Sequence, residues 1–560
     1  MSIDNKNHKL YNTDLGKEHA DEHVRWNRRQ FLMTNGLAGL GSMFLSGIPI
    51  SAAISEELAQ LAMANTDNIL VLVKMFGGND GLNMVFPHTS AAGVDEYYQL
   101  RPTIAQKKGT NFTDNQVLSG LGNDGYAIPS TMDSIMPLWR EGKMGVIHNV
   151  GYANQDYSHF ASIDIWASAS DSFHDKRINN GYIGRYLSQE FPSFAETPPT
   201  VPPALRIGYS TDLIFSAPGR QQMELVFNSP RDFFTLAQYG KLYATDGFGD
   251  CPQGEEREFV RQLTNSSLRY SQTVIDAYNR STNKVNYPTG TTSNLASQLS
   301  IVSRLIKGNL GTKIYMVYID GFDTHGSQAN SHPRLLGNLA DSVSAFYNDL
   351  KADNAQSNVT LMTFSEFGRT IKENGTQGTD HGNLAPMMIF GDAVKGGHYG
   401  TPINLQDPIL KTSTVVYYES QPSTDFRKVY SGVLQDYLCL DSEVVDYALG
   451  QSYNKLNLFK NPCGGGSQGS NLNTILIGHS PNESDAKMID IKFSQLGGSE
   501  VELTVKSLNG KTLAILLDKY APKGSYKITF DPAKWKISSG EYIYELKSSG
   551  KLFTRRFSIF

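Results

Sequence analysis

The sequence is short of several features that mark common classes of protein. Its 560 residues include only three cysteines and four tryptophans. No uninterrupted apolar run reaches the roughly 20 residues of a membrane-spanning helix. The formal net charge of −5 gives no basic surface for nucleic acid. These absences exclude a disulfide scaffold, a membrane-spanning bundle and a typical nucleic-acid-binding protein. The hydrophobic content of 39% predicts a globular protein with a large core and more than one domain.

The cysteines Cys251, Cys439 and Cys463 lack the CxxC spacing of redox and metal sites. A single disulfide is compatible with an exported protein, and the sequence leaves the pairing open. We assign the cysteines no catalytic role.

Residues 1–64 are predicted to be an export leader. A long polar stretch ends in Arg28-Arg29 and is followed by Phe31-Leu32, a mildly apolar, Gly-rich run over residues 36–53, and the small-residue site Ala62-Met63-Ala64. This order resembles a twin-arginine leader. The general secretory route stays open as the alternative.

The stretch from Ile314 to Gly400 contains most of the candidate functional residues. Three apolar runs in it predict buried strands that each give way to a loop rich in Asp, Glu, His and Gly: Ile314–Ile319, Val359–Phe364 and Pro386–Phe390. Between the first two runs, apolar residues recur at helical spacing from Arg334 to Leu350. Such a unit favours a parallel sheet, which binds ligands at the carboxyl ends of its strands. The predicted fold class is therefore α/β, with a mostly parallel sheet sandwiched by helices.

The first strand of this sheet is predicted directly after the leader. An apolar run from Asn68 to Phe76 leads into the Gly-rich loop Gly77-Gly78-Asn79-Asp80-Gly81, which is typical of the opening of a parallel α/β domain. Asp80 is a candidate metal ligand in this loop. The alternative is that Asp80-Gly81 forms only a turn, because Asp-Gly pairs are common turn formers.

A second strand, predicted from Met144 to Val150, leads to a helix start at Ser158 and His159. A serine at a helix start is most often an N-cap. It is also a suitable place for a nucleophile, because the helix dipole and the free backbone N–H groups favour negative charge there. The sequence leaves both roles open for Ser158, and His159 is equally compatible with a packed, hydrogen-bonded histidine.

Acidic and imidazole side chains are concentrated in the loops beside the predicted strands: Asp80, Asp323, His325, His332, Glu366, Asp380, His381 and His398. Mixed carboxylate and imidazole ligands suit zinc or another divalent transition metal. The alternative is that Asp323-Thr324-His325 and Asp380-His381 are loop residues that form turns and N-caps. Their location at successive strand ends favours the metal site.

The motifs taken together resemble a known family. Six of them carry the resemblance: GGNDGLN (77–83), SHF (158–160), GFDTHGSQ (321–328), TFSEFGR (363–369), TDHG (379–382) and STDFRKVY (423–430). They resemble the exported domain-of-unknown-function family 1501, which is assigned to the alkaline phosphatase and sulfatase superfamily. The resemblance covers about Asn65 to Asn457.

This resemblance implies roles for individual residues. Asp80 matches the metal ligand of the first strand, Ser158 the nucleophile, Asp323 with His325 the second ligand group, and His381 a late histidine ligand. The chain departs from the superfamily pattern in two places. Glu366-Phe367 stands where the superfamily has a paired Asp-His, and the spacing from Asp323 to His325 is shorter than usual unless His332 takes that place. The expected ligands of a divalent metal, with zinc as one candidate, are Asp80, Asp323, His325, Glu366, Asp380 and His381.

The carboxyl-terminal part is predicted to be a separate unit after a central domain of residues 65–460. Residues 461–472 are rich in Gly and Ser, which predicts a flexible linker. Residues 473–560 contain alternating runs separated by turns, which predict a small all-β sandwich. Its Leu508-Asn509-Gly510 turn and basic-aromatic last strand resemble the type A sorting domain of the type IX secretion system in the Bacteroidetes. The alternative is a carbohydrate-binding or spacer sandwich.

The function expected from these patterns is an exported, metal-dependent hydrolase of phosphate or sulfate esters, with Ser158 as the catalytic residue. Its substrate would be a small-molecule or polymer ester, and the type IX machinery would carry it through the periplasm to the cell surface or medium. The alternative is a non-catalytic surface binding or structural protein that keeps the alkaline-phosphatase-like fold. No nucleic-acid partner and no stable membrane span after leader removal are expected.

Overall fold

The structure is a computed structural model that describes most of the chain after the predicted leader. The described residues are 66–106, 116–122, 125–191, 194, 199–218, 221–238, 252–289, 294–383, 385–407, 422–463, 474–481, 487–495, 498–507, 510–522, 524–548 and 551–559. The predicted leader, most of the predicted linker and Cys251 lie outside them. No helix in the described ranges is both long enough and apolar enough to cross a membrane.

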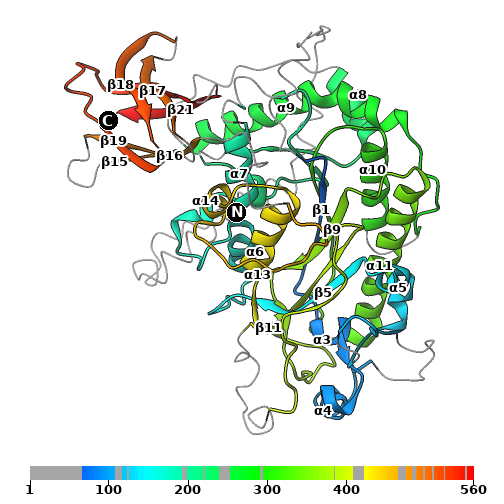
Figure 1. The fold of residues 1–560 in the computed structure, drawn as a ribbon. Helices are drawn as coiled ribbons and strands as arrows, with labels where there is room; N and C mark the ends of the chain where they lie inside the picture. The colour runs from blue at the N-terminus through cyan, green and yellow to red at the C-terminus, as the bar shows by residue number, and fades with distance from the viewer. Residues whose placement is uncertain are drawn as a thin grey trace, which may run out of the picture.

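A nine-stranded mixed sheet forms the centre of the molecule (Figure 1). Its strands are β1 (Ile69–Met75), β5 (Met144–Gly151), β6 (Ala204–Ile207), β7 (Glu224–Phe227), β8 (Ile314–Ile319), β9 (Val359–Ser365), β12 (Ala385–Phe390), β13 (Gly397–Tyr399) and β14 (Thr424–Asp425). The strand order is β13-β5-β12-β9-β1-β8-β6-β7, and β14 pairs with β5. Every pair is parallel except those that β12 makes with β5 and β9. The predicted α/β domain is confirmed as a mixed α/β fold with a large sheet and helices.

Helices cover both faces of this sheet (Figure 1). Leu70 and Leu72 of β1 belong to one hydrophobic cluster, whereas Val71 and Val73 belong to the other, because successive side chains of a strand point to opposite faces. The first cluster includes residues of α6 (His159–Ser168), α7 (Tyr182–Glu190), α13 (Phe426–Gly432) and α14 (Ser442–Leu449). The second includes residues of α5 (Met136–Arg140), α8 (Pro230–Gln238), α9 (Pro252–Arg280), α10 (Leu295–Lys307) and α11 (Gln328–Ala352). Burial on both faces explains why the strands are continuously apolar.

The helix α13 begins directly after Asp425, which is its N-cap. The Asp425 carboxylate accepts a hydrogen bond from the Arg427 N–H at 2.9 Å. The chain continues as a π-helix, Val433–Tyr437. The Tyr437 hydroxyl donates to the carbonyls of Ile69 and Asn358, at 3.0 and 2.7 Å. This segment is therefore fixed against the beginnings of β1 and β9.

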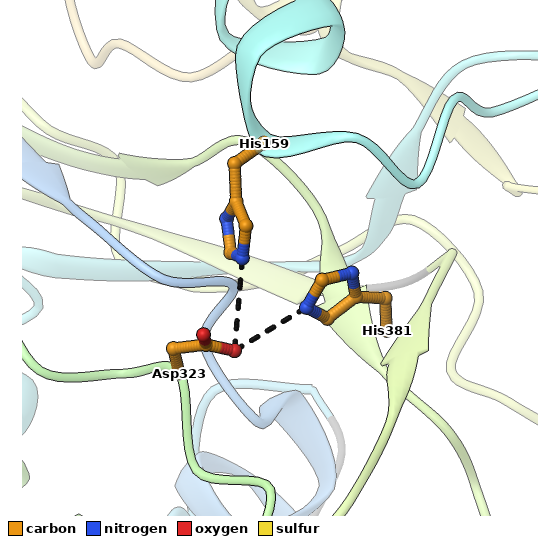
Figure 2. Close-up of side chains that lie close together, drawn as sticks. All are labelled: His159, Asp323 and His381. Atoms are coloured by element: carbon orange, nitrogen blue, oxygen red, sulfur yellow. Dashed lines mark hydrogen bonds and ion pairs between the residues drawn. The ribbon is translucent and has the colours of Figure 1, made fainter. Parts of the chain in front are cut away.

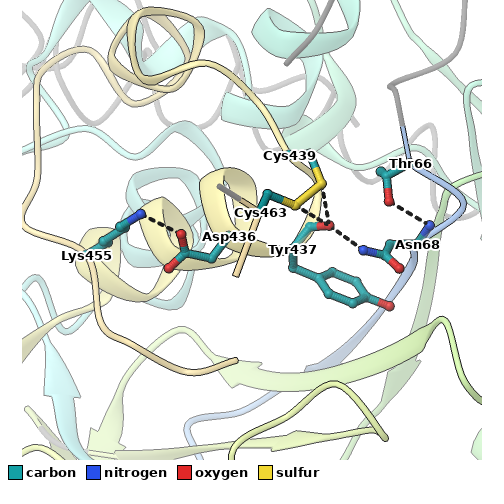
Figure 3. The surroundings of a disulfide bond; sticks show 7 residues. All are labelled: Thr66, Asn68, Asp436, Tyr437, Cys439, Lys455 and Cys463. Atoms are coloured by element: carbon teal, nitrogen blue, oxygen red, sulfur yellow. Dashed lines mark hydrogen bonds and ion pairs between the residues drawn. A yellow bond between two sulfur atoms is a disulfide. The ribbon is translucent and has the colours of Figure 1, made fainter. Parts of the chain in front are cut away.

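A disulfide between Cys439 and Cys463 follows this helical segment (Figure 3). The Tyr437 carbonyl, which lies beside both sulfur atoms, also accepts a hydrogen bond from the Asn68 amide at 2.7 Å. The bond spans a sequence separation of 24 residues, and closing a loop of that size stabilises a fold by roughly 3 kcal/mol in the chain-entropy description. The disulfide thus fixes Cys463, near the start of the predicted linker, to the segment that is hydrogen-bonded to the beginnings of β1 and β9.

The carboxyl-terminal residues form two antiparallel sheets. One contains β15 (Thr474–Pro481), β16 (Ile489–Gln495) and β19 (Gly524–Phe530). The other contains β18 (Thr512–Ala521), β17 (Ser499–Ser507), β20 (Gly540–Ser548) and β21 (Lys551–Ile559) in that order. The sequence pattern did not predict β15. A bulge between Leu476 and Gly478 interrupts its pairing with β16, and such a bulge breaks the alternation by which a strand is recognised.

The sandwich contacts the central domain through α7. The Gln189 side-chain amide donates to the Leu476 carbonyl at 3.0 Å, and its oxygen accepts from the Leu476 N–H at 2.9 Å. Gln189 and Leu476 are both fully buried. The Gln189 side chain thus makes the two hydrogen bonds that a neighbouring strand would make to β15. The sandwich and the central domain are therefore joined by a specific polar contact.

We expect Gln189→Leu to weaken this contact. The substitution keeps most of the side-chain volume but leaves the buried N–H and carbonyl of Leu476 without partners, which costs about 1–3 kcal/mol. Urea unfolding should show that loss, and hydrogen exchange should accelerate in residues 474–481. Gln272→Leu is the matched control, because Gln272 makes an exposed hydrogen bond to Asp276 on α9. Equal stability of the two variants would contradict the prediction.

Candidate metal centre

The loops that carry the predicted site residues meet at one edge of the sheet. Asp80 follows β1, Asp323 follows β8 and Glu366 follows β9, and these three strands are parallel neighbours. Asp380 and His381 precede β12, and β12 runs antiparallel to β9. The amino end of β12 therefore lies at the same edge as the carboxyl ends of the other strands.

His398 does not belong to this group. β12 runs antiparallel to β5 and therefore ends at the edge of the sheet opposite the site. His398 lies on β13, which follows β12 and pairs with the first half of β5. Its Nδ1 is 2.8 Å from Nε2 of His148, and the two rings stack with centroids 5.0 Å apart. The sequence grouped His398 with the other histidines because an apolar run does not reveal the direction of its strand.

Three side chains converge in the centre of the site (Figure 2). His159, Asp323 and His381 each present one ligand atom, and these atoms lie within 4.8 Å of one another. Asp323 Oδ1 is 3.6 Å from His159 Nε2 and 3.3 Å from His381 Nε2. His325 adds a further nitrogen, because its Nε2 is 3.1 Å from both Asp323 Oδ1 and His381 Nε2.

The other nitrogen of each ring has an acceptor of its own. His381 Nδ1 is 2.8 Å from the Tyr157 carbonyl, and His159 Nδ1 is 2.8 Å from Glu366 Oε1. His325 Nδ1 is 3.1 Å from Asp380 Oδ1. A carbonyl or carboxylate oxygen accepts only, so these contacts assign the ring proton to Nδ1 and leave Nε2 of each neutral ring with a lone pair. Burial lowers the pKa of His381, which favours its neutral form.

These lone pairs face one another and a carboxylate oxygen. Two unprotonated nitrogens 3.1 Å apart, as in His325 and His381, cannot hydrogen-bond to each other. A cation between them would satisfy both nitrogens. Ligands about 2.0–2.1 Å from a tetrahedral zinc ion lie roughly 3.3 Å apart, and Asp323 Oδ1 is 3.6, 3.1 and 3.3 Å from the Nε2 atoms of His159, His325 and His381. The outer acceptors on Nδ1 are also the usual orienting partners of metal-bound histidines. The residues therefore fit a divalent transition metal.

The carboxylates around the centre are held in their ionised forms. Burial opposes ionisation of Asp323, but the hydrogen bond and charge of Arg369 lower its pKa. Burial also opposes ionisation of Glu366, whose pKa is lowered by hydrogen bonds from His159 and the Gly77 N–H. For Asp380 the hydrogen bonds from Asn374 and His325 outweigh burial and lower the pKa.

Arg369 connects the loops of the site. It lies on β10 (Gly368–Arg369), opposite His381 on β11 (His381–Gly382). Its guanidinium donates to Asp323 Oδ1 at 2.5 Å and to the carbonyls of the three neighbouring loops: Gly77, Gly78, Phe322 and Thr379. One of its nitrogens is also 3.5 Å from His325 Nε2. Arg369 thus fixes Asp323 and partly offsets its charge.

Glycine is required where the β1 loop enters the site. Gly78 has φ +76°, and a Cβ there would lie 2.3 Å from the ring of Phe367. Phe367 in turn packs against the rings of His159 and His381, with centroids 4.7 and 4.5 Å away. Phe367, where the superfamily pattern has a histidine, therefore supports the imidazoles and ligates nothing.

Asp80 lies outside the converging group. Its Oδ2 is 2.6 Å from Arg101 Nη1, and both side chains are fully buried. Burial opposes ionisation of Asp80, but Arg101, His332 and Gln328 lower its pKa. His332 is also buried, with Nε2 3.0 Å from Asn79 Oδ1, and burial lowers its pKa to about 4. The expected ligands Glu366 and Asp380 lie behind His159 and His325 as their hydrogen-bond partners.

Ser158 occupies the N-cap position of α6, but its side chain makes no capping hydrogen bond. Its own N–H donates to Asp156 Oδ1 at 2.8 Å, and its carbonyl accepts from the Ser162 N–H. The next residue, His159, is the member of the centre that the sequence did not assign. The sequence feature that could have identified His159 is its position directly after Ser158, a candidate nucleophile at a helix start.

A pocket of about 360 Å³ opens beside these side chains. It is lined by Tyr157, His325, Asp380 and His381. The converging nitrogens of His325 and His381 therefore border a space large enough for a small group of a ligand.

The comparisons with known proteins concern this region. A family described as "Protein of unknown function (DUF1501)" matches residues 271–412, which include Asp323, His325, Glu366, Asp380 and His381. No curated protein matches the chain.

Solved structures of low similarity also match. A protein of the alkaline phosphatase superfamily from Vibrio parahaemolyticus is 8% identical with a TM-score of 0.28, covering 66% of this chain and 71% of that chain. The PsFucS1 sulfatase from Pseudoalteromonas sp. is 9% identical with a TM-score of 0.29, covering 84% and 85%. The alkaline phosphatase of the Antarctic bacterium TAB5 is 9% identical with a TM-score of 0.24, covering 60% and 95%. At these values the likenesses carry no argument about chemistry.

A second buried charged group connects β1 with β7 and with the segment between β6 and β7. Lys74 Nζ of β1 is 2.7 Å from Asp212 Oδ2, and the Asp212 N–H donates to Glu224 Oε1 at 2.9 Å. Burial opposes ionisation of Asp212, but Lys74 and Arg206 lower its pKa. Burial raises the pKa of Glu224 to about 8. Glu224 is therefore protonated in the folded protein at neutral pH.

Glu224 should make stability fall as pH rises. Its folded-state pKa lies above its ordinary value, so the folded state holds this proton more tightly than the unfolded state. The contribution of this proton to the free energy of unfolding is fully present below about pH 4.5 and is lost as the pH rises toward about 8. Across that window the free energy of unfolding falls by up to roughly 1.4 kcal/mol per pH unit. Relative to the parent, Glu224→Gln should gain stability across that window in urea unfolding. Exposed Glu500→Gln is the control, and a pH-independent difference for Glu224→Gln would contradict the assignment.

Proposed function

We propose that this chain is an exported, metal-dependent hydrolase of phosphate or sulfate esters. One observation carries the proposal. The ligand atoms of His159, Asp323 and His381 lie within 4.8 Å of one another, and His325 Nε2 is 3.1 Å from Asp323 Oδ1 and from His381 Nε2. Each Nδ1 of the three histidines has an outer acceptor. His159, Asp323 and His381 would hold one divalent cation with His325 beside them, and zinc is the best match to two or more imidazoles and a carboxylate.

A divalent cation bound there would supply Lewis-acid charge that polarises an ester oxygen and lowers the pKa of an attacking hydroxyl. The chain's own residues would do the rest. Glu366 and Asp380 orient His159 and His325, and Arg369 fixes Asp323. Tyr157 lines the pocket beside the centre.

The amino-terminal end of α6 would bind the acid group of the ester. The Ser158 side chain makes no capping hydrogen bond, and the Asp156 carboxylate accepts from the Ser158 N–H. The first-turn N–H groups that follow Ser158 and the helix dipole would favour an anion beside His159. Ser158 lies at this helix end and is the proposed nucleophile. A water molecule is the alternative nucleophile.

A non-catalytic binding protein is the second candidate function. The observation that favours it is the pairing of both strand-end aspartates with buried arginines, Asp80 with Arg101 and Asp323 with Arg369. The two guanidinium groups offset the negative charges of Asp80 and Asp323, and these negative charges would otherwise favour the binding of metal ions. Metal binding therefore decides between the two candidates.

Export is the part of the proposal that rests mainly on sequence. The leader-like segment and the resemblance of residues 473–560 to a type IX sorting domain support delivery to the cell surface or medium. The Cys439–Cys463 disulfide is also consistent with it, because disulfides persist in oxidising compartments.

We expect the chelator-treated protein to bind one equivalent of zinc and not two, because Asp80 is already paired with Arg101. His159→Ala should weaken zinc binding by at least roughly 100-fold, since it removes a direct ligand. Isothermal titration calorimetry measures both quantities. The control is His174→Ala, an exposed histidine outside the site. Zinc binding that is absent, or unaffected by His159→Ala, would overturn the proposed metal centre.

Ser158→Ala tests the nucleophile. It should abolish turnover of an aryl phosphate or aryl sulfate by the metal-loaded protein, while zinc affinity stays within a few-fold of the parent. Because the Ser158 side chain makes no capping hydrogen bond, the free energy of unfolding should change by less than about 0.5 kcal/mol. Full turnover in the variant would exclude Ser158 and leave water as the attacking group.

A further inference from the structure

The charges of the proposed metal centre constrain which esters it can accept. Three carboxylates contact the histidines of the centre: Asp323 contacts His159, His325 and His381, Glu366 contacts His159, and Asp380 contacts His325. One guanidinium, that of Arg369, lies among them. With a divalent cation added, as in the proposed function on which this inference rests, these groups together carry no net charge.

Arg369 is not accessible to a substrate, because its side chain is fully buried. Its Nε donates to Gly78, its Nη1 to Thr379, and its Nη2 to Gly77, Phe322 and Asp323. Nη1 also lies 3.5 Å from His325 Nε2. Its charge is therefore committed to the protein.

Three other buried cations near this edge of the sheet are committed as well. Arg101 is fully buried and donates to Asp80, Asn83 and the carbonyls of residues 370 and 371. Lys74 and Arg206 both face Asp212, at 2.7 and 3.7 Å, and both are about 95% buried. Among the described residues that line the pocket there is no lysine or arginine, whereas Asp380, which does line it, is 53% exposed.

We infer that the site selects esters whose acid group carries one negative charge, such as sulfate monoesters and phosphodiesters, over phosphate monoesters that carry two. A single charge is matched by the cation and by the first-turn N–H groups of α6. A second charge meets a centre that is already neutral and the exposed carboxylate of Asp380. Above about pH 7 a phosphate monoester carries that second charge, because its second pKa is about 6.

The selectivity can be measured with one leaving group throughout. The zinc-loaded full chain is assayed at about pH 8.5 with p-nitrophenyl phosphate, methyl p-nitrophenyl phosphate and p-nitrophenyl sulfate. We expect kcat/KM for at least one singly charged ester to exceed that for the phosphate monoester by about tenfold or more. The two singly charged arms show which acid group, phosphodiester or sulfate, the site accepts.

Binding of inert anions gives a second readout that does not depend on turnover. Benzenesulfonate carries one charge, and phenylphosphonate carries two at this pH. Calorimetric titration of the zinc-loaded protein should show at least about tenfold tighter binding of benzenesulfonate, the difference that a charge mismatch of about 1.4 kcal/mol produces.

A charge added to the pocket wall should weaken the preference. Tyr157→Lys places a cation where Tyr157 now lines the pocket, and His381 keeps its partner because that partner is the backbone carbonyl of residue 157. The variant should raise kcat/KM for the phosphate monoester, relative to the singly charged esters, at least about fivefold. Tyr157→Leu is the neutral control and should leave that ratio within about twofold.

The outcomes separate this inference from the proposed function. Preference for p-nitrophenyl phosphate, or tighter binding of phenylphosphonate, overturns the inference and leaves the hydrolase standing. Absence of turnover with every ester overturns both. A ratio that changes equally in Tyr157→Lys and Tyr157→Leu would show that charge is not the cause.

Discussion

The interaction on which the site depends is the set of hydrogen bonds made by the Arg369 guanidinium. It joins the loop after β1, through the carbonyls of Gly77 and Gly78, to the loop after β8, through Phe322 and Asp323. It also reaches Thr379, just before His381. Segments separated by about 300 residues of sequence are thereby held at one point. A buried guanidinium must be satisfied on every side, so these loops have little freedom to separate.

The same guanidinium shapes the chemistry available at this point. Arg369 offsets part of the charge of Asp323 before any ion is bound, and Arg101 does the same for Asp80. What remains is a compact set of imidazole lone pairs and one carboxylate oxygen. In the proposed function this arrangement would hold one cation, and that cation and the end of α6 would bind the acid group. The fixed internal charges would then limit both the number of metal ions and the charge of the ligand.

Contacts elsewhere in the fold stabilise the sheet but add no side chain to the candidate site. The Cys439–Cys463 disulfide and the Tyr437 hydroxyl fix the segment after α13 to the beginnings of β1 and β9, at the amino ends of those strands. Gln189 of α7 joins the sandwich to the central domain through Leu476. These contacts are specific and buried, so the carboxyl-terminal sandwich is placed by side-chain hydrogen bonds in addition to the chain connection.

The sequence by itself determined the strands and the candidate loops. Continuous apolar runs identified β1, β5, β8, β9 and β12 because each is buried on both faces, and Asp323, His325 and His381 stood out by residue type. Tertiary structure decided the rest. The reversal of β12 brought His381 into the site and took His398 out of it, and only packing showed that His159 joins the centre while Asp80 pairs with Arg101. Hydrophobic periodicity records which residues are buried, whereas strand direction and ion pairing depend on partners distant in the sequence.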